Sequence, residues 1–251
     1  MSFLNKLGIG IGFNGVASRE VSRGTSQNLR ARVPGGLPPT AGTTRVQEPL
    51  ESTRVSNGLK EFLWNLDGLG RGALLDLGPA WQTTLSFFIE RGFRVSSEDL
   101  LRAWKGFLTE EEARLRDNAN ASELLDMTPI GRGKRFLAEN VQYARSSFDA
   151  VLLWDVLDYL EPALAKQIVA QVTEVLRPGG VVFAMFHSKK PEGFQRYRVA
   201  DSNTLQVISA AVICPAQKVY QNREIQDLFG RYRTMKSFVG RDQLRETLFI
   251  K

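Results

Sequence analysis

Apolar residues along the chain recur at two spacings, one typical of helices and one of buried strands. Residues 59–66 repeat at helical spacing, and the short apolar run 73–77 that follows has the length of a buried strand. Residues 177–180, Arg-Pro-Gly-Gly, predict a tight turn into another buried strand. The same reasoning predicts further helices over residues 85–89, 100–115, 162–176 and 222–229. It predicts strands over residues 73–77, 93–97, 135–138, 148–154, 181–186, 233–239 and 246–250.

Strands and helices alternate over most of this length, which is typical of a parallel sheet covered by helices. The last two strands are instead joined by a short turn at residues 240–243, which predicts a hairpin. The predicted fold is therefore α/β. It is a doubly wound, mostly parallel sheet of seven strands with an antiparallel terminal strand.

The first 51 residues differ from the rest, and we expect a flexible, basic N-terminal tail before an α/β domain over residues 52–251. Residues 1–50 are rich in Gly, Ser, Thr, Pro and Arg and hold six basic against two acidic residues. Residues 1–17 are more apolar, which leaves two interpretations open: a loose tail, or a contact with a protein or a membrane surface. The glycines at 10, 12 and 15 match a dinucleotide-binding spacing, but no predicted strand leads into them and no helix leaves, so we assign no such site.

Composition excludes several classes of function. The 251 residues are 43% hydrophobic, which is typical of a globular protein, and no apolar run approaches the roughly 20 residues of a transmembrane helix. One cysteine, Cys214, and one histidine, His187, exclude an internal disulfide and a zinc site of several Cys and His ligands. We therefore expect no metal and a reducing, cytoplasmic location. The net charge of +6 lies mostly in residues 1–50, so we do not expect nucleic acid as a partner of the nearly balanced remainder.

The ends of the first two predicted strands carry residues suited to a nucleotide-like ligand. Ligands of open α/β sheets bind at the carboxyl edge, where strand order reverses. Gly78, two residues after Asp76, allows close approach of the backbone to a ligand. Asp99 lies 23 residues beyond Asp76, at a strand end, and is our first choice to accept the hydroxyl hydrogens of a ribose, with Glu98 second. Both acids equally suit capping of the helix that follows.

Three spaced motifs together carry a family resemblance. They are Leu-Leu-Asp-Leu-Gly at 74–78, Ser-Phe-Asp-Ala-Val at 147–151 and Val-Leu-Arg-Pro-Gly-Gly at 175–180. In this order and spacing, residues 60–251 resemble the class I S-adenosylmethionine-dependent methyltransferases of the type 11 kind. The resemblance implies a Rossmann-like methyltransferase fold and S-adenosyl-L-methionine as the cofactor.

The resemblance also implies roles for individual residues. Asp76, Gly78 and Ala80 would belong to the first cofactor-binding turn. The other implied contacts follow later strands: Glu139 or Asn140 at the adenine edge, and Trp154 with Asp155 near the methionine moiety. Trp154 equally suits packing in the core.

The chain departs from the family at two places. Most members have Asp/Glu-x-Gly-x-Gly-x-Gly after the first strand, whereas residues 76–82 read Asp-Leu-Gly-Pro-Ala-Trp-Gln, a degenerate version with one glycine. Pro79 removes an amide donor, and Trp81 puts a large ring beside the expected cofactor. After the fourth strand, Asp158-Tyr159 stands where many small-molecule methyltransferases have Glu-His.

Methyl transfer from a sulfonium needs mainly alignment of the acceptor with the methyl group, and a base when the acceptor is an alcohol or amine. Asp155 and Tyr159 are the nearest candidate bases by position, and His187 is the third, although a lone histidine is more often structural. We expect a small-molecule acceptor, selected by residues 191–222. The alternative is a non-catalytic protein of the same fold that acts as a binding or assembly module through its N-terminal tail.

Overall fold

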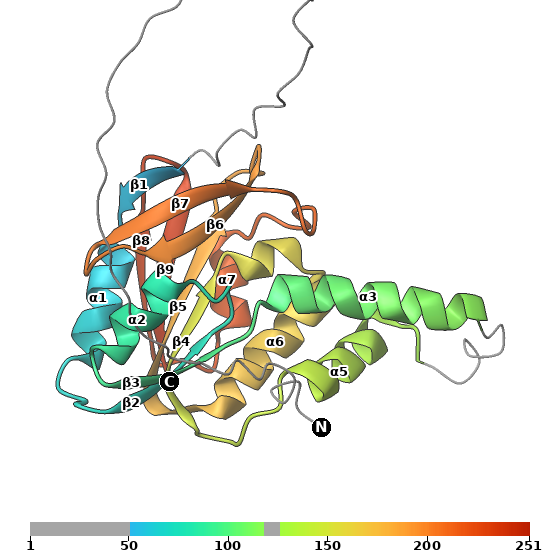
Figure 1. The fold of residues 1–251 in the computed structure, drawn as a ribbon, viewed down its shortest axis with the longest axis horizontal. Coiled ribbons are helices and arrows are strands. Elements are labelled where there is room, and N and C mark those ends of the chain that lie inside the picture. The colour runs from blue at the N-terminus through green and yellow to red at the C-terminus, as the bar shows by residue number, and fades with distance from the viewer. Residues whose placement is uncertain (1–50, 118–125) are drawn as a thin grey trace, which may run out of the picture. The chain divides into compact units, whose positions relative to one another are not determined.

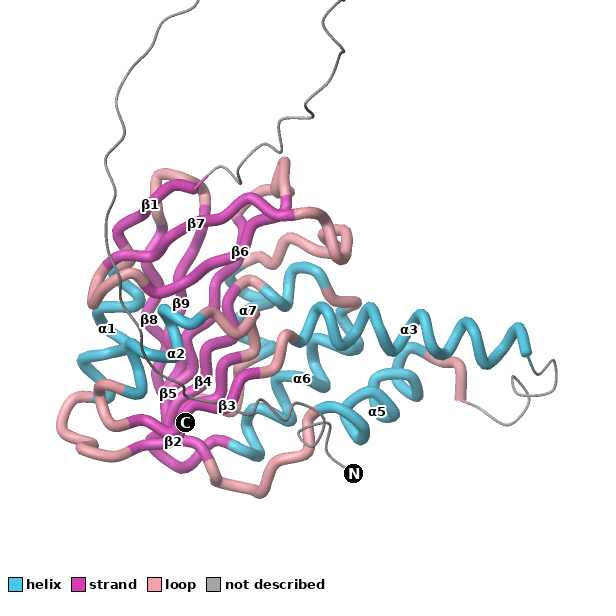
Figure 2. Tube along the Cα trace, viewed as in Figure 1, coloured by secondary structure: helices cyan, strands magenta, loops and turns pink. Residues whose placement is uncertain are grey.

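The computed structural model describes residues 51–117 and 126–251, and its elements are shown in Figure 1 and Figure 2. The strands are β1 (Glu51–Val55), β2 (Gly72–Asp76), β3 (Phe93–Ser97), β4 (Phe148–Trp154), β5 (Leu176–His187), β6 (Phe194–Val199), β7 (Thr204–Ala210), β8 (Thr234–Val239) and β9 (Leu244–Ile250). The α-helices are α1 (Asn57–Leu66), α2 (Gln82–Ile89), α3 (Leu100–Asp117), α5 (Pro129–Asn140), α6 (Pro162–Val175) and α7 (Asn222–Leu228). A short 3-10 helix, η2 (Val156–Tyr159), follows β4.

The main sheet has the strand order β3-β2-β4-β5-β9-β8. The first four strands are parallel, and β9 runs antiparallel to both of its neighbours. This confirms the predicted doubly wound α/β class and its antiparallel terminal strand. The sheet has six strands rather than seven because residues 135–138, predicted as a strand, lie inside α5. Pro129 in its first turn and the Thr128 side chain, which accepts from the Gly131 amide, start that helix.

Helices cover both faces of the main sheet (Figure 1). On β4, Ala150 and Leu152 pack with α1 and α2, whereas Val151 and Leu153 pack with α3, α5 and α6. Successive strand residues point to opposite faces, so this strand, which is apolar except for Asp149, contributes to both cores. Within the described residues, no helix is both long and apolar enough to cross a membrane.

A second, small sheet has the order β1-β7-β6 and was not predicted. It joins residues 51–55 to a hairpin from residues 194–210, a part of the segment expected to select the acceptor. The Val199 amide donates to Thr84 Oγ1 of α2 at 3.0 Å, which ties the small sheet to the turn region after β2. The predicted tail, residues 1–51, lies outside the described residues except for Glu51, which begins β1.

The predicted turn at residues 177–180 is an outward bulge within β5. Phe148 pairs with Leu176, but Ala150 pairs with Val181, so the intervening β5 residues have no partners in β4. Gly179 adopts a φ of 78°, a conformation that favours glycine. Arg177 closes the bulge by donating from Nη1 to both carboxylate oxygens of Asp149, at 2.6 and 2.7 Å.

Candidate functional site

Asp76 is the last residue of β2 and is almost fully buried. Its Oδ1 accepts hydrogen bonds from the Gly78 amide at 2.9 Å and from Trp154 Nε1 at 2.7 Å. Its Oδ2 is buried without a partner among the described residues. Burial raises the pKa of Asp76 to about 6 against the lowering effect of these hydrogen bonds. The carboxyl group therefore has an unused acceptor at the carboxyl edge of the sheet.

Trp154 lies directly against Gly78. A Cβ at Gly78 would be 2.6 Å from two indole atoms, Cδ1 and Nε1. The indole is stacked on the Tyr197 ring of β6, with centroids 6.3 Å apart and planes 12° apart. Trp154 also has a φ of 52°, an unusual conformation for a large residue, which the surrounding contacts must stabilise. The indole thus packs against the turn that the resemblance assigns to the cofactor.

Asp99 is engaged by an arginine of the small sheet. Arg196 Nη2 donates to Asp99 Oδ1 at 2.9 Å and to Oδ2 at 3.1 Å, and the arginine side chain is only 8% exposed. Asp99 Oδ1 also accepts from the Arg102 amide at 3.3 Å, so Asp99 caps the start of α3. Neighbouring Glu98 is half-buried, and burial followed by the charge of Asp99 raises the pKa of its carboxyl. Asp99 therefore caps α3, as one of the two alternatives expects. The carboxylate oxygens that a ligand contact would need are already hydrogen-bonded within the chain.

A second group of polar side chains follows β4 and β5. Asp158 Oδ2 accepts from the His187 backbone amide at 2.7 Å and lies 2.9 Å from His187 Nδ1. Asp155 Oδ2 lies 3.9 Å from His187 Nε2, too far for a hydrogen bond. Asp155 Oδ2, Asp158 Oδ1 and the Tyr159 hydroxyl are buried without partners in the described residues. The structure therefore brings together all three predicted catalytic residues.

Burial dominates the titration of this group. It raises the pKa of Asp155 to about 7, opposed by His187 and reinforced by Asp158. It also raises the pKa of Tyr159, and the nearby charges of Asp155 and Asp158 add to that effect. A Tyr159 phenol with a raised pKa holds its proton more firmly and is a poor base at neutral pH. Asp155 instead titrates near neutrality, where a proton can be held or released.

Other predicted residues lie apart from these contacts. Ala80 is exposed, and Glu139 is exposed on α5. Asn140 Nδ2 donates to the Phe136 carbonyl of its own helix at 3.0 Å, so the expected loop after a third strand is absent at this position. The Trp81 ring has the guanidinium of Arg198 over it at 5.5 Å. Its buried Nε1 has no partner in the described residues.

Sequence reasoning missed two residues of the site. Asp158 was considered only as a departure from a family motif, yet a lone carboxylate inside the apolar run 156–160 is itself a signal of a buried polar partner. Arg196 was considered only as part of a mixed basic and aromatic segment. Its contact with Asp99 spans 97 residues and carries no local sequence signal.

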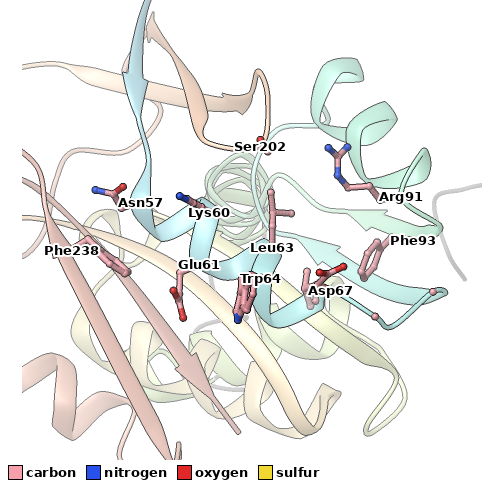
Figure 3. A pocket seen from close by; sticks show the side chains of 13 residues that line it. Asn57, Lys60, Glu61, Leu63, Trp64, Asp67, Arg91, Phe93, Ser202 and Phe238 are labelled. Carbon is pink, nitrogen blue, oxygen red and sulfur yellow. The ribbon is translucent and has the colours of Figure 1, made fainter.

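A surface cavity of about 770 Å³ lies elsewhere (Figure 3). Its lining includes Lys60, Glu61 and Trp64 of α1, with Gly70 just before β2 and Phe93 at the start of β3. Gly70 and Phe93 mark the amino-terminal ends of these strands, whereas the site residues follow the carboxyl ends. Trp64 is 74% exposed there. The cavity is therefore separate from the candidate site.

Comparison with protein-family models matches residues 109–184 to the methyltransferase domain family. The match includes the motifs at 147–151 and 175–180 and confirms the predicted resemblance over this part of the chain. The motif at 74–78 and the acidic pair at 98–99 lie before the matched residues. No curated protein matches the chain.

Solved methyltransferase structures resemble the chain only remotely. One is the 1,6-didemethyltoxoflavin-N1-methyltransferase of Burkholderia thailandensis, at 16% identity and TM-score 0.41, covering 78% of this chain and 79% of that one. Another is an S-adenosylmethionine-dependent methyltransferase of Mesorhizobium loti, at 12% identity and TM-score 0.41, covering 76% and 96%. The glycopeptide N-methyltransferase MtfA, at 14% identity and TM-score 0.38, covers 84% and 99%. All of these scores are below 0.5, so none of these likenesses carries an argument about function.

Proposed function

We propose that this chain, whose residues 109–184 match the methyltransferase domain, transfers a methyl group from S-adenosylmethionine to a small-molecule acceptor. The observation that supports this function best is a set of buried acceptor atoms at the carboxyl edge of the sheet that have no partner in the described part of the chain. Asp76 Oδ2 follows β2, and Asp155 Oδ2 follows the adjacent strand β4. Ligands of open α/β sheets bind at this edge.

The chemistry of these atoms fits the cofactor. S-adenosylmethionine offers hydroxyl and ammonium donors and a positive sulfonium, which are suited to carboxylate acceptors. Ser97 Oγ, the register partner of Asp76 on β3, is also buried without a partner in the described residues. Leaving buried polar atoms unpaired costs about 1–3 kcal/mol each, so a polar ligand that pairs them gains that amount.

Two of the chain's own contacts compete with the cofactor. The Trp154 indole covers Gly78, and Arg196 occupies both carboxylate oxygens of Asp99. Arg196 comes from β6, and so does Tyr197, on which the Trp154 indole is stacked. A displacement of the small sheet would therefore release Asp99 and free one side of the indole, which would still be hydrogen-bonded to Asp76. We infer that cofactor binding requires this displacement. The apparent affinity is then the intrinsic affinity multiplied by the fraction of molecules in the open state.

When bound, the cofactor supplies a methyl group already activated on a sulfonium. The chain's residues contribute binding and orientation: Asp76 at the end of β2, Asp99 once released from Arg196, and Asp155 after β4. Glu98, beside Asp99, is the second candidate for the ribose hydroxyls. The polar group of Asp155, Tyr159 and His187 would face the acceptor.

Calorimetric titration of the full chain with S-adenosylmethionine and S-adenosylhomocysteine tests the proposal. We expect binding that is weakened at least tenfold by Asp76→Asn, because the amide lacks the second carboxylate acceptor. The control Glu192→Gln, at a side chain that is 90% exposed, should bind as the native chain does. An absence of binding by the native chain at millimolar ligand would contradict the proposed function.

The second candidate is a non-catalytic member of the same fold. The contacts of Trp154 with Gly78 and of Arg196 with Asp99 favour it, because a chain that never opens would keep both. In that case, a binding or assembly role would depend on residues 1–50. Deleting these residues should leave cofactor affinity unchanged in an enzyme and abolish partner binding in an assembly module.

A further inference from the structure

We propose that His187 and Asp158 form a proton-accepting pair for the methyl transfer inferred above, with His187 Nε2 as the base and Asp158 as the positioning residue. The acceptor is then one whose attacking atom carries a proton, an O–H or N–H group. This inference rests on the proposed function and adds to it a class of acceptor and a residue, Asp158, with a defined role.

The position of the Asp158 carboxylate favours one tautomer of the neutral imidazole. The same oxygen, Oδ2, accepts the His187 amide at 2.7 Å and lies 2.9 Å from Nδ1. A carboxylate at Nδ1 favours a proton on that nitrogen, which leaves the lone pair of a neutral ring on Nε2. Asp158 Oδ2 thus holds both the backbone amide and the ring of His187, and Nε2 is the nitrogen that can accept a proton.

Asp158 is itself held firmly in place. It is completely buried within η2, and its carbonyl accepts from the amides of Gln217 and Lys218 at 2.7 and 3.1 Å. Rotation of the carboxylate would leave the His187 amide without its acceptor. The orientation of the imidazole is therefore set before any ligand binds, which is the property required of a positioned base.

The other side of the imidazole retains unused polar atoms. Asp155 Oδ2 is 3.9 Å from Nε2 and has no hydrogen-bond partner in the described residues, and the same is true of the Tyr159 hydroxyl. The Tyr159 ring stands edge-on to the His187 ring, with centroids 6.3 Å apart. His187 bonds through Nδ1, and the structure described for residues 51–117 and 126–251 shows no hydrogen bond at Nε2. The His187 side chain is 11% exposed, so Nε2 is the nitrogen left for a ligand.

The proton balance of the step is simple. The acceptor's lone pair forms a bond to the methyl carbon, and the carbon–sulfur bond breaks with its electron pair left on sulfur. The acceptor's O–H or N–H bond breaks, and its proton passes to His187 Nε2. The imidazolium is stabilised by Asp158 on its far side, and the proton leaves to solvent after product release. No oxidant, reductant or metal is required.

Charges from several elements act on His187. Burial lowers its pKa, but the hydrogen bond to Asp158 and the charges of Asp155, Asp158 and Asp242 together raise it above the usual value. The other charged or titratable groups of this environment are Tyr159 of η2, Arg196 of β6 and Arg245 of β9. The base form is therefore favoured by alkaline pH, and removal of the Asp158 charge should lower the pKa of His187.

Nuclear magnetic resonance of ring-labelled histidine tests the pair directly, because His187 is the only histidine of the chain. In the neutral ring we expect the proton on Nδ1. Asp158→Asn should lower the pKa of His187, whereas Asp227→Asn, an exposed change on α7, should leave it unchanged. A neutral ring protonated on Nε2 would overturn the proposed pair.

The decisive comparison uses the native chain, so it does not depend on a variant that folds. We expect saturation with S-adenosylmethionine to lower the pKa of His187 by about one unit relative to S-adenosylhomocysteine, because only the former carries a sulfonium charge near Nε2. Equal pKa values with both ligands bound would overturn the role of His187 while leaving the proposed function intact. Failure of both ligands to bind would instead overturn the proposed function.

Discussion

The carboxyl edge of the main sheet has two parts that differ in the contacts that their polar groups make within the chain. At the ends of β2 and β3, Trp154 and Arg196 cover Gly78 and Asp99. After β4 and β5, Asp155 and Tyr159 keep unpartnered atoms beside an oriented His187. We call the first part the covered part, consisting of Asp76, Gly78 and Asp99, and the second the open part, consisting of Asp155, Asp158, Tyr159 and His187.

The difference between the two parts shows where a ligand must spend binding energy on displacing the chain's own contacts. The open part holds polar atoms without partners among the described residues, but Asp155, Asp158 and Tyr159 are at most 4% exposed, so a ligand must reach buried atoms there too. A ligand at the covered part must first displace Trp154 from Gly78 and Arg196 from Asp99. Conformational change of this kind lowers apparent affinity without altering the contacts made in the bound state. The following predictions test whether the covered part is closed by Trp154 and Arg196 specifically.

The largest effect is expected from Gly78→Ala. The new Cβ would lie 2.6 Å from the Trp154 indole, so the indole or the turn must move, and we expect the free energy of unfolding to fall by about 3 kcal/mol. Urea denaturation measures this loss. Gly193→Ala is the matched control, because nothing lies within 4 Å of a Cβ there. If Trp154 causes the clash, the loss should fall below about 1 kcal/mol in a Trp154→Ala background.

Asp155→Asn should show how much the buried Asp155 charge lowers the stability of the folded chain. Asp155 has a pKa of about 7 in the folded chain, above its ordinary value of 3.8, so the folded state binds the proton more tightly than the unfolded state. Its contribution to stability is therefore present at low pH and is lost as pH rises from about 4 to about 7. We expect Asp155→Asn to stabilise the chain by about 2.5 kcal/mol more at pH 8 than at pH 5. An equal effect at both pH values in thermal unfolding would contradict a buried charge at this position.

Much of the fold could be predicted from the sequence because its signals are local. Strand β4 was predicted at its observed bounds, since a run in which six of seven residues are apolar is typical of a strand covered on both faces. Residues 135–138 were mistaken for a strand because four residues are too few to distinguish a helix from a strand by periodicity. The start signals of α5, Thr128 and Pro129, lie earlier and favour the helix.

Only those site residues that lie at the ends of recognisable strands could be predicted from the sequence. Asp76 and Gly78 follow a recognisable strand, and His187 ends one. The contact of Arg196 with Asp99 and the stacking of Tyr197 on Trp154 depend on β6, whose sheet is completed by pairing of β7 with β1, segments about 150 residues apart in the chain. Such pairing is set by packing across the whole molecule and leaves no local pattern.

The pH dependence of cofactor affinity gives a smaller effect that links the two parts. Asp76, with a pKa of about 6, and Asp155, with a pKa of about 7, are partly protonated below neutrality. A cationic ligand favours their charged forms, so S-adenosylmethionine affinity should rise about tenfold from pH 5.5 to 7.5. Calorimetry with S-adenosylhomocysteine, which lacks the sulfonium charge, should show a shallower rise. Parallel pH profiles for the two ligands would contradict contact between these carboxyls and the sulfonium end.

Arg196→Met should produce the smallest change, and its direction distinguishes the two interpretations of the covered part. The substitution keeps an apolar stem within β6 and removes the Arg196 contacts from both oxygens of Asp99, so cofactor affinity should rise about fivefold, on the order of 1 kcal/mol. Arg198→Met on the same strand is the control, since Arg198 pairs with Glu51 and Gln206 rather than Asp99. A fall in affinity with Arg196→Met alone would mean that the arginine itself contacts the cofactor. The small sheet would then form a wall of the binding site, and the closed contacts would already be those of the bound state.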